Sequence, residues 1–184
     1  MVAILKALHV PHAVIGALAA SFHGVVRASL DADALISLPP SRAAISKLIG
    51  ALRKAGFQSR YRLGALRDPV GAVISIEDRF NNRVDLLMKI RGMTEAVFSR
   101  TIEAEFMKAR ICVIGVEDFI AMKVFAGSPK DLSDVRGVLR VSSDRMGLTL
   151  LKALVQPYGK GALRTLESLL DEHRRERGGK NLGT

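Results

Sequence analysis

The sequence contains one cysteine, no tryptophan and two tyrosines among its 184 residues. The single cysteine, Cys112, excludes an intramolecular disulfide and a cysteine-cluster metal site. It lies in the apolar run 111–114, which suits a small buried hydrophobic side chain. A cytoplasmic location follows most easily from this cysteine usage. The scarcity of aromatic side chains also argues against a surface that stacks on single-stranded nucleic acid.

A hydrophobic run long enough to cross a membrane is also missing. Residues 13–22 are uncharged and follow a single lysine, which imitates the apolar part of a signal peptide. However, Pro11 and His12 interrupt this region, and the uncharged stretch is too short to span a bilayer. It also fits a strand, a turn and a helix. We therefore interpret it as part of the mature protein and expect no membrane partner.

What the sequence does have is apolar residues and positive charge. Hydrophobic residues make up 48% of the chain, which is enough for a sizeable core and one ordinary domain. Lysine and arginine outnumber aspartate and glutamate by 28 to 18, giving a net charge of +10. This excess favours an anionic partner such as nucleotide or nucleic acid. Part of it lies in residues 173–180, so charge alone does not decide between an enzyme and a plain nucleic-acid-binding module.

Strand and helix patterns alternate early in the chain, and helical patterns close it. Apolar runs bounded by turn residues predict strands, and apolar residues at helical spacing between caps and breakers predict helices. We expect strands at 12–15, 29–38, 73–77, 83–88 and 110–116. We expect helices at 2–8, 17–23, 42–55, 117–126, 130–139, 148–155 and 162–174. The pattern predicts an α/β or α+β fold, with a mixed sheet flanked by helices and a helical C-terminal part.

Two aspartates lie two residues apart on one predicted strand. Side chains alternate across a strand, so Asp31 and Asp33 share one face, and Ala34 and Ile36 point to the other, which we expect to be the core side. Neighbouring carboxylates repel unless a cation lies between them. A divalent ion such as Mg²⁺ is the natural solution, because it prefers a few carboxylate oxygens and completes its shell with water and phosphate.

A third aspartate, Asp85, stands alone in an otherwise apolar strand. A buried unpaired carboxylate is energetically expensive. If its strand lies beside the strand of Asp31 and Asp33, Asp85 completes a metal-binding cluster. Each residue also has an ordinary interpretation as a turn residue, a helix cap or an ion-pair partner for Arg27 or Arg83.

The carboxylates occur together with other motifs. Ile15-Gly16-Ala17 forms a turn that opens a helix, and 31–33 and Asp85 follow it; further on come the stretches 116–123 and 130–135. In this order and spacing the sequence resembles the polymerase-β-like nucleotidyltransferase superfamily, and its minimal subgroup from abortive-infection and toxin–antitoxin systems. The resemblance runs from about residue 12 to residue 139. It implies a nucleotidyltransferase-like domain at 1–140, with C-terminal helices at 141–175 packed on it; we expect 176–184 to form a flexible tail.

The resemblance implies transfer of a nucleoside monophosphate from a nucleoside triphosphate to an acceptor hydroxyl, with release of pyrophosphate. Mg²⁺ or Mn²⁺ would be held by the catalytic carboxylates Asp31, Asp33 and Asp85. The acceptor stays open between RNA such as tRNA, a protein side chain and a small molecule such as an aminoglycoside. An antitoxin is an implied further partner. The alternative is a non-catalytic nucleotide-binding or regulatory protein of the same fold.

The resemblance also implies a set of phosphate-binding residues: Gly16, Ala17, Arg27, Lys123 and Lys130. Ala17 stands where the family has glycine or serine, so it keeps a backbone N–H but offers no hydroxyl. Arg27 either neutralises Asp31 or reaches a phosphate. Lys123 has mostly apolar neighbours, so its charge needs a reason, and we expect it to face the triphosphate. For Lys130 an ordinary solvated helix start is an equal alternative.

Overall fold

A computed structural model describes residues 1–180, and its backbone forms two compact units. The first unit comprises Met1–Ala19 and Arg27–Ile114; the second comprises Ala20–Val26 and the chain from Gly115 onward. Helix α2 begins in the first unit and ends in the second. Helices α4 and α5 thus group with the C-terminal helices, and the boundary expected at residue 140 falls inside α5. Among the described residues, no helix is long and apolar enough to cross a membrane.

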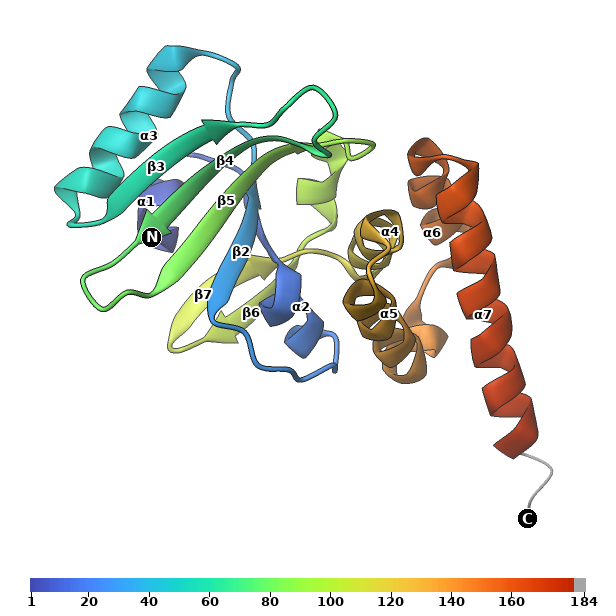
Figure 1. Cartoon of the computed structure of the whole chain (residues 1–184). Coiled ribbons are helices and arrows are strands. Elements are labelled where there is room, and N and C mark those ends of the chain that lie inside the picture. The colour runs from blue at the N-terminus through green and yellow to red at the C-terminus, as the bar shows by residue number, and fades with distance from the viewer. Residues whose placement is uncertain (181–184) are drawn as a thin grey trace. The chain divides into compact units, whose positions relative to one another are not determined.

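The first unit is built on a seven-stranded mixed sheet in the order β3-β4-β5-β2-β1-β7-β6 (Figure 1). Strand β2 pairs in parallel with β5, and β1 in parallel with β7; the other neighbours are antiparallel. The strands are β1 His12–Ile15, β2 Asp31–Ile36, β3 Gln58–Leu63, β4 Val70–Glu77, β5 Arg83–Ile90, β6 Ile102–Phe106 and β7 Ala109–Val113. The helices of this unit are α1 Val2–Ala7, α2 Gly16–Phe22, which continues into the second unit, and α3 Arg42–Lys54, with a short 3₁₀ turn at Glu95–Arg100.

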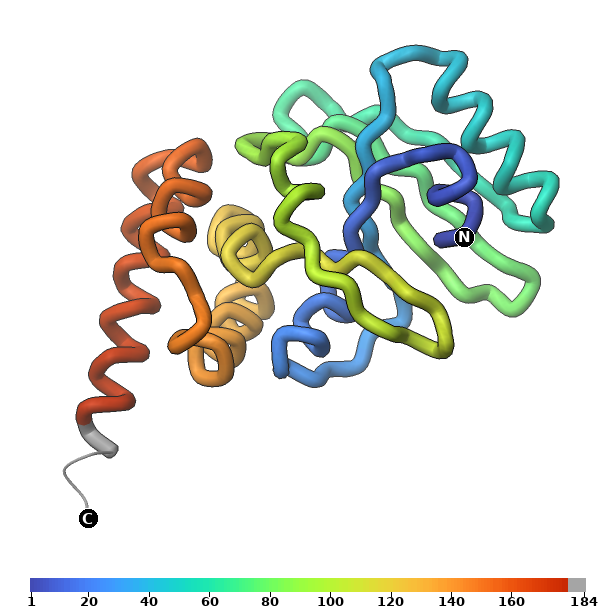
Figure 2. The backbone as a smooth tube through the Cα atoms, turned by 180° about the vertical axis from the view of Figure 1, so that it is seen from behind, coloured from blue at the N-terminus to red at the C-terminus, as the bar shows by residue number. Residues whose placement is uncertain are grey.

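A hydrophobic core cluster of the first unit lies on one face of the sheet. Helices α1 and α3 cover this face, as the view from behind shows (Figure 2). Leu5 of α1 and Leu48 and Leu52 of α3 are fully buried against the sheet. Ser41 caps α3 by accepting a hydrogen bond from the Ala44 backbone N–H at 3.2 Å, as the sequence predicts. Because all these apolar side chains occupy one face, polar side chains of the same strands point to the other.

The second unit consists of helices around α4. This helix is mostly apolar and has no distinct polar face, which is typical of a helix buried among others, and its few charged residues include the buried Asp118 and Lys123. Phe119 and Ile120 of α4 are fully buried, as are Val135 of α5 and Leu166 of α7. The helices are α4 Val116–Ala126, α5 Pro129–Ser142, α6 Leu148–Val155 and α7 Lys160–Lys180, with 3₁₀ turns at Ser143–Arg145 and Gln156–Tyr158.

The last helix is longer than expected. Residues 176–180, predicted to lie in a flexible tail, continue α7, and residues 181–184 of that tail lie outside the described residues. Ion pairs accompany this extension: Glu176 pairs with Arg140 at 3.0 Å, and Arg177 pairs with Asp144. The segment is therefore tied into the unit by ion pairs of both signs, which the composition of the tail did not reveal.

Candidate active site

The three aspartates come together on two neighbouring parallel strands. Asp33 of β2 lies directly opposite Asp85 of β5, and Asp31, two residues earlier, lies opposite Arg83. Ala34 and Leu86, the next residues of the two strands, belong to the core cluster on the other face. The carboxylates therefore share the polar face, and β5 lies beside β2 as the interpretation of Asp85 requires.

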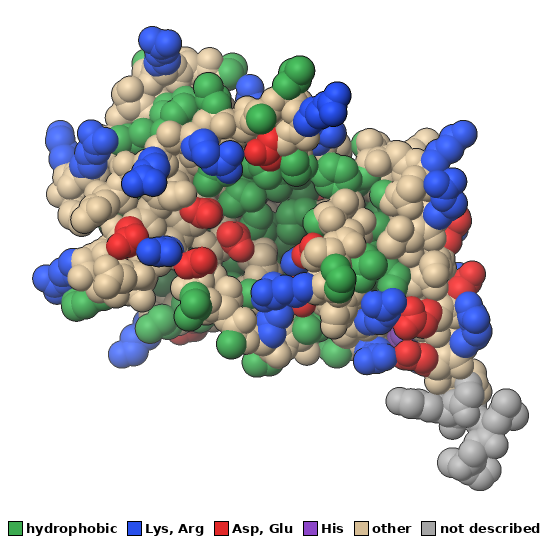
Figure 3. Space-filling model, in the orientation of Figure 1, with side chains coloured by type: hydrophobic (Ala, Val, Ile, Leu, Met, Phe, Trp, Pro, Cys, Tyr) green, Lys and Arg blue, Asp and Glu red, His purple; other side chains and the backbone are tan. Residues whose placement is uncertain are grey.

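This arrangement places like charges close together. Neighbouring strands are about 4.8 Å apart, so Asp33 and Asp85 face each other at a distance where carboxylates repel. Asp31 is exposed, while Asp33 and Asp85 are half-buried. Figure 3 shows acidic side chains gathered in the middle of this face, with lysine and arginine side chains around them. A bound cation would relieve the repulsion.

The oxygen ligands that the three aspartates offer suit Mg²⁺ better than zinc or calcium. Within the described part of the chain, no three His, Cys, Asp or Glu side chains converge closely enough to hold a metal ion by themselves. Mg²⁺ is usually held by one or two carboxylates together with waters and substrate phosphates, whereas zinc and calcium sites have more protein ligands. An all-oxygen set open to solvent, with two carboxylates facing each other, therefore fits Mg²⁺ bound together with a phosphate-bearing substrate.

Gly16 supports this face from the end of β1. Its φ of +65° lies in the left-handed region that favours glycine. A Cβ atom on Gly16 would lie 2.1 Å from Oδ2 of Asp33, far inside van der Waals contact. Gly16 is thus required both by the turn and by the position of the Asp33 carboxylate.

The two other phosphate-binding candidates of the first unit, Ala17 and Arg27, differ in their surroundings. Ala17 follows Gly16 and is buried at 4% exposure, so only its backbone could serve a ligand. Arg27 is half-buried in the segment that leads into β2, in the same unit as the carboxylates.

Lys123 belongs to the second unit, where two carboxylates surround its ammonium group. Its Nζ lies 2.6 Å from Oδ1 of Asp131 and 3.0 Å from Oδ2 of Asp134. The Lys123 side chain is only 8% exposed and also lies over the ring of Phe119, 5.7 Å from its centroid. The charge of Lys123 thus has a structural reason within α4 and α5, and its predicted contact with triphosphate stays a prediction.

The same cluster shifts the pKa of Asp131. Burial acts to raise this pKa, but hydrogen bonds donated by Lys123 and Ser128 outweigh burial and hold the pKa below its ordinary value. Ser128 is also the N-cap of α5 and accepts a hydrogen bond from the Asp131 backbone N–H at 3.2 Å. Lys130, in the first turn of this helix, is exposed.

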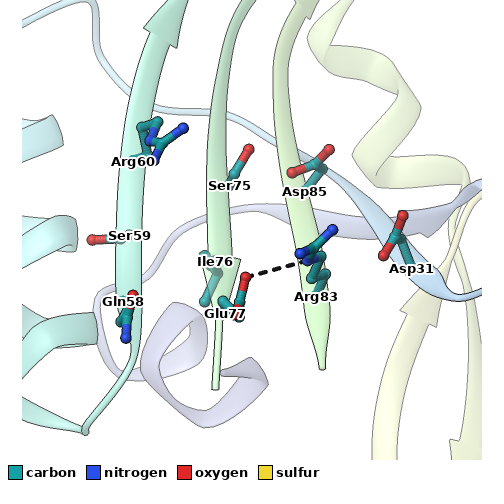
Figure 4. Close-up of a pocket in the computed structure, with 9 residues that line it drawn as sticks. All are labelled: Asp31, Gln58, Ser59, Arg60, Ser75, Ile76, Glu77, Arg83 and Asp85. Atoms are coloured by element: carbon teal, nitrogen blue, oxygen red, sulfur yellow. Dashed lines mark hydrogen bonds and ion pairs between the residues drawn. The ribbon is translucent and has the colours of Figure 1, made fainter. Parts of the chain in front are cut away.

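A groove of about 490 Å³ continues from the carboxylates across β5, β4 and β3 (Figure 4). Besides Asp31 and Asp85 it is lined by residues that the sequence interpretation did not select, including Gln58, Arg60 and Ser75. For Gln58 and Arg60, the signal that could have found them is the alternation of polar and larger side chains in residues 58–63 after the break at residue 56, which indicates an edge strand. Ser75 lies in the strand expected at 73–77, where its polar side chain among apolar neighbours marks the opposite face.

Comparison with solved structures identifies the fold. An antigenic nucleotidyltransferase-like protein from Paracoccidioides brasiliensis matches with a TM-score of 0.57 at 12% identity, over 95% of this chain and 85% of that one. A solution structure of the antibiotic-resistance factor ANT(2″)-Ia matches with a TM-score of 0.55 at 15% identity, over 95% and 93% of the two chains. The ANT(2″)-Ia complex with adenylyl-2″-tobramycin gives 0.54 at 16% identity, over 85% and 91%. No protein-family model matches the sequence, and no curated protein matches it significantly. The chain has a nucleotidyltransferase-like fold.

The Gly16 turn yields a direct test of the site's geometry. We expect Gly16→Ala to lower the stability of the protein by more than 1 kcal/mol, because it adds left-handed strain and a clash with Asp33. Gly50→Ala is the matched control: Gly50 lies inside α3 with open space around it, so alanine should raise stability by about 0.5–1 kcal/mol. Urea unfolding measures both changes. Equal effects of the two substitutions would contradict the Gly16–Asp33 contact.

The Lys123 cluster yields a second test. We expect Lys123→Met to cost about 3–5 kcal/mol near neutral pH, because it leaves Asp131 and Asp134 without their shared cation. In the wild type, the lowered pKa of Asp131 adds stability above its ordinary value of 3.8, and this is lost as the pH falls through the lower folded-state pKa. The difference between the two proteins should therefore shrink in acid. Unfolding curves at several pH values measure it.

The control for this test is Lys130→Met, which removes an exposed lysine from the same region. We expect its effect to stay within about 0.5 kcal/mol at all pH values. A Lys123→Met variant as stable as this control would show that the cluster does not stabilise the second unit.

Proposed function

We propose that the chain is a metal-dependent nucleotidyltransferase that moves a nucleoside monophosphate from a nucleoside triphosphate to an acceptor hydroxyl. The observation that carries this proposal is the position of Asp33 opposite Asp85, with Asp31 on the same face, in a nucleotidyltransferase-like fold. The repulsion within this group of carboxylates has no purely structural benefit, which favours a functional role for it.

In the proposed reaction the acceptor oxygen attacks the α-phosphorus, a new P–O bond forms, and the bond to the departing pyrophosphate breaks. Asp31, Asp33 and Asp85 would hold Mg²⁺ or Mn²⁺, which supplies charge neutralisation for the phosphates and for an in-line displacement. Asp85 stands at the outer side of the cluster, next to the groove, and would accept the proton of the acceptor hydroxyl. Gly16 would hold Asp33 in place through its turn.

The remaining candidates have supporting roles in the proposal. Ala17 would offer its backbone to the triphosphate, and Arg27 a guanidinium from the segment before β2. Lys130 would contribute as an exposed cation. Lys123 would act mainly by fixing Asp131 and Asp134, with which it already pairs, and through them the start of α5.

The acceptor could be RNA such as tRNA, a protein side chain or a small molecule, and the motif resemblance supports a role in a toxin–antitoxin pair. A non-catalytic nucleotide-binding or regulatory protein is the second candidate. Two observations favour it: Ala17 offers no side-chain donor, and the charge of Lys123 is neutralised by two carboxylates. The two candidates differ in whether pyrophosphate is released.

The test is pyrophosphate release with each of the four triphosphates, Mg²⁺ or Mn²⁺, and bulk tRNA as the first acceptor. We expect the double variant Asp31→Asn and Asp33→Asn to lose about a hundredfold or more of the activity, the scale on which a group that stabilises developing charge contributes. Removing like charges should leave its stability equal to or above that of the wild type. This large loss of activity without unfolding is therefore the expected result.

Glu103→Gln, which neutralises an exposed carboxylate on β6, is the control and should keep full activity. Activity that persists in the double aspartate variant would overturn the assignment of the carboxylates. Triphosphate binding without any pyrophosphate release by the wild type would favour the non-catalytic candidate.

A further inference from the structure

The groove beside the carboxylates is formed by two rows of polar side chains that cross the strands. Pairing across the sheet aligns Asp33, Asp85, Ser75 and Arg60 in one row. It aligns Asp31, Arg83, Glu77 and Gln58 in the other. Figure 4 shows these rows, Asp33 excepted, as two lines of side chains across β3, β4, β5 and β2. Each row thus leads from the aspartates of β2 outward to the edge strand β3.

Of the two arginines that line the groove, Arg60 has no acidic partner among the residues that the structure describes. Arg83 pairs with Glu77, its Nε lying 3.2 Å from the carboxylate. Among the described residues, neither a salt bridge nor a side-chain hydrogen bond engages Arg60, and the same is true of Ser75. Both are exposed. A guanidinium, a hydroxyl and the amide of Gln58 therefore offer several donors to a ligand, which suits the three oxygens of a phosphate.

We propose that this groove binds the acceptor, and that the acceptor is a hydroxyl compound carrying a phosphate group, which Arg60 and Ser75 contact. The inference rests on the proposed function for the role of Asp85. Strands lie about 4.8 Å apart, so the Arg60 backbone is about 10 Å from that of Asp85, two strands away. The phosphate and the reacting hydroxyl thus lie in neighbouring parts of one molecule, as in a sugar phosphate or the terminal nucleotide of an RNA.

The charges of the groove add a condition to this binding. Asp31, Glu77 and Asp85 outnumber Arg60 and Arg83, so an anion is repelled unless the carboxylates are neutralised. In the wild type a divalent cation would neutralise them. The binding of phosphate and of metal should therefore strengthen each other, because coupling between two sites is reciprocal.

The test is a titration of the isotope-labelled protein with ribose 5-phosphate, followed by NMR, in excess Mg²⁺. We expect the resonances of the Arg60 and Ser75 backbone amides and of Arg60 Nε to shift, and ribose to cause no such shift. Arg60→Gln should weaken binding at least tenfold. Arg62→Gln is the matched control, since Arg62 lies on the same strand and face but pairs with Asp68 at 3.4 Å, and it should change affinity less than twofold.

The double variant Asp31→Asn and Asp33→Asn separates this inference from the proposed function. With two carboxylates neutralised, it should bind ribose 5-phosphate through Arg60 without Mg²⁺. If this variant binds ribose 5-phosphate but the wild type does not bind it in excess Mg²⁺, the result supports the phosphate site and contradicts the metal-dependent function. If neither protein shows shifts at Arg60 and Ser75, or if Arg60→Gln binds as tightly as the wild type, the inference is overturned. If the enzyme is active, comparing tRNA with a free ribonucleotide as acceptor shows whether the phosphate belongs to an RNA or to a small molecule. Preferred transfer to tobramycin, which carries no phosphate, would contradict the inference for either source.

Discussion

The placement of two like charges, Asp33 and Asp85, at paired positions of neighbouring strands is the constraint on which the rest of the candidate site depends. Parallel pairing of β2 and β5 places the two carboxylates opposite each other, and a core on the far face prevents either strand from shifting by one residue. The glycine at position 16 leaves room for the Asp33 carboxylate where any side chain would collide with it. The fold thus holds two like charges at paired positions of neighbouring strands, where a cation and a phosphate-bearing substrate would offset their charge.

Different parts of the first unit serve this one arrangement. Helices α1 and α3 bury the apolar face of the sheet, so the opposite face can be polar across several strands. Because strand pairing aligns side chains in rows, the carboxylates continue directly into the groove that ends at Arg60. Metal, triphosphate and acceptor would therefore share one surface. In the second unit two neighbouring carboxylates, Asp131 and Asp134, are neutralised by the protein itself, because the ammonium group of Lys123 pairs with both.

Sequence patterns predicted the mixed α/β fold and the shared face of Asp31 and Asp33, because alternation in strands and helix caps are local signals. That the strand of Asp85 lies beside theirs was left as a condition, since pairing between strands far apart in the chain is not a local signal. They missed β3 and β6: both are edge strands with mostly exposed side chains, and their stability comes from pairing with a neighbour rather than from an apolar run. Arg60 was missed for that reason. The pairing of Lys123 with Asp131 and Asp134 depends on how α4 packs against α5, which spacing along the chain does not specify.

The central claim is that the facing carboxylates hold a divalent cation together with a nucleoside triphosphate. A crystal structure with Mn²⁺ and a non-hydrolysable triphosphate tests it most directly, because manganese is located by its anomalous signal. The account predicts manganese about 2.0–2.3 Å from carboxylate oxygens of Asp33 and Asp31 or Asp85, and from phosphate oxygens of the triphosphate. A triphosphate bound elsewhere, or manganese absent from these aspartates, would contradict it.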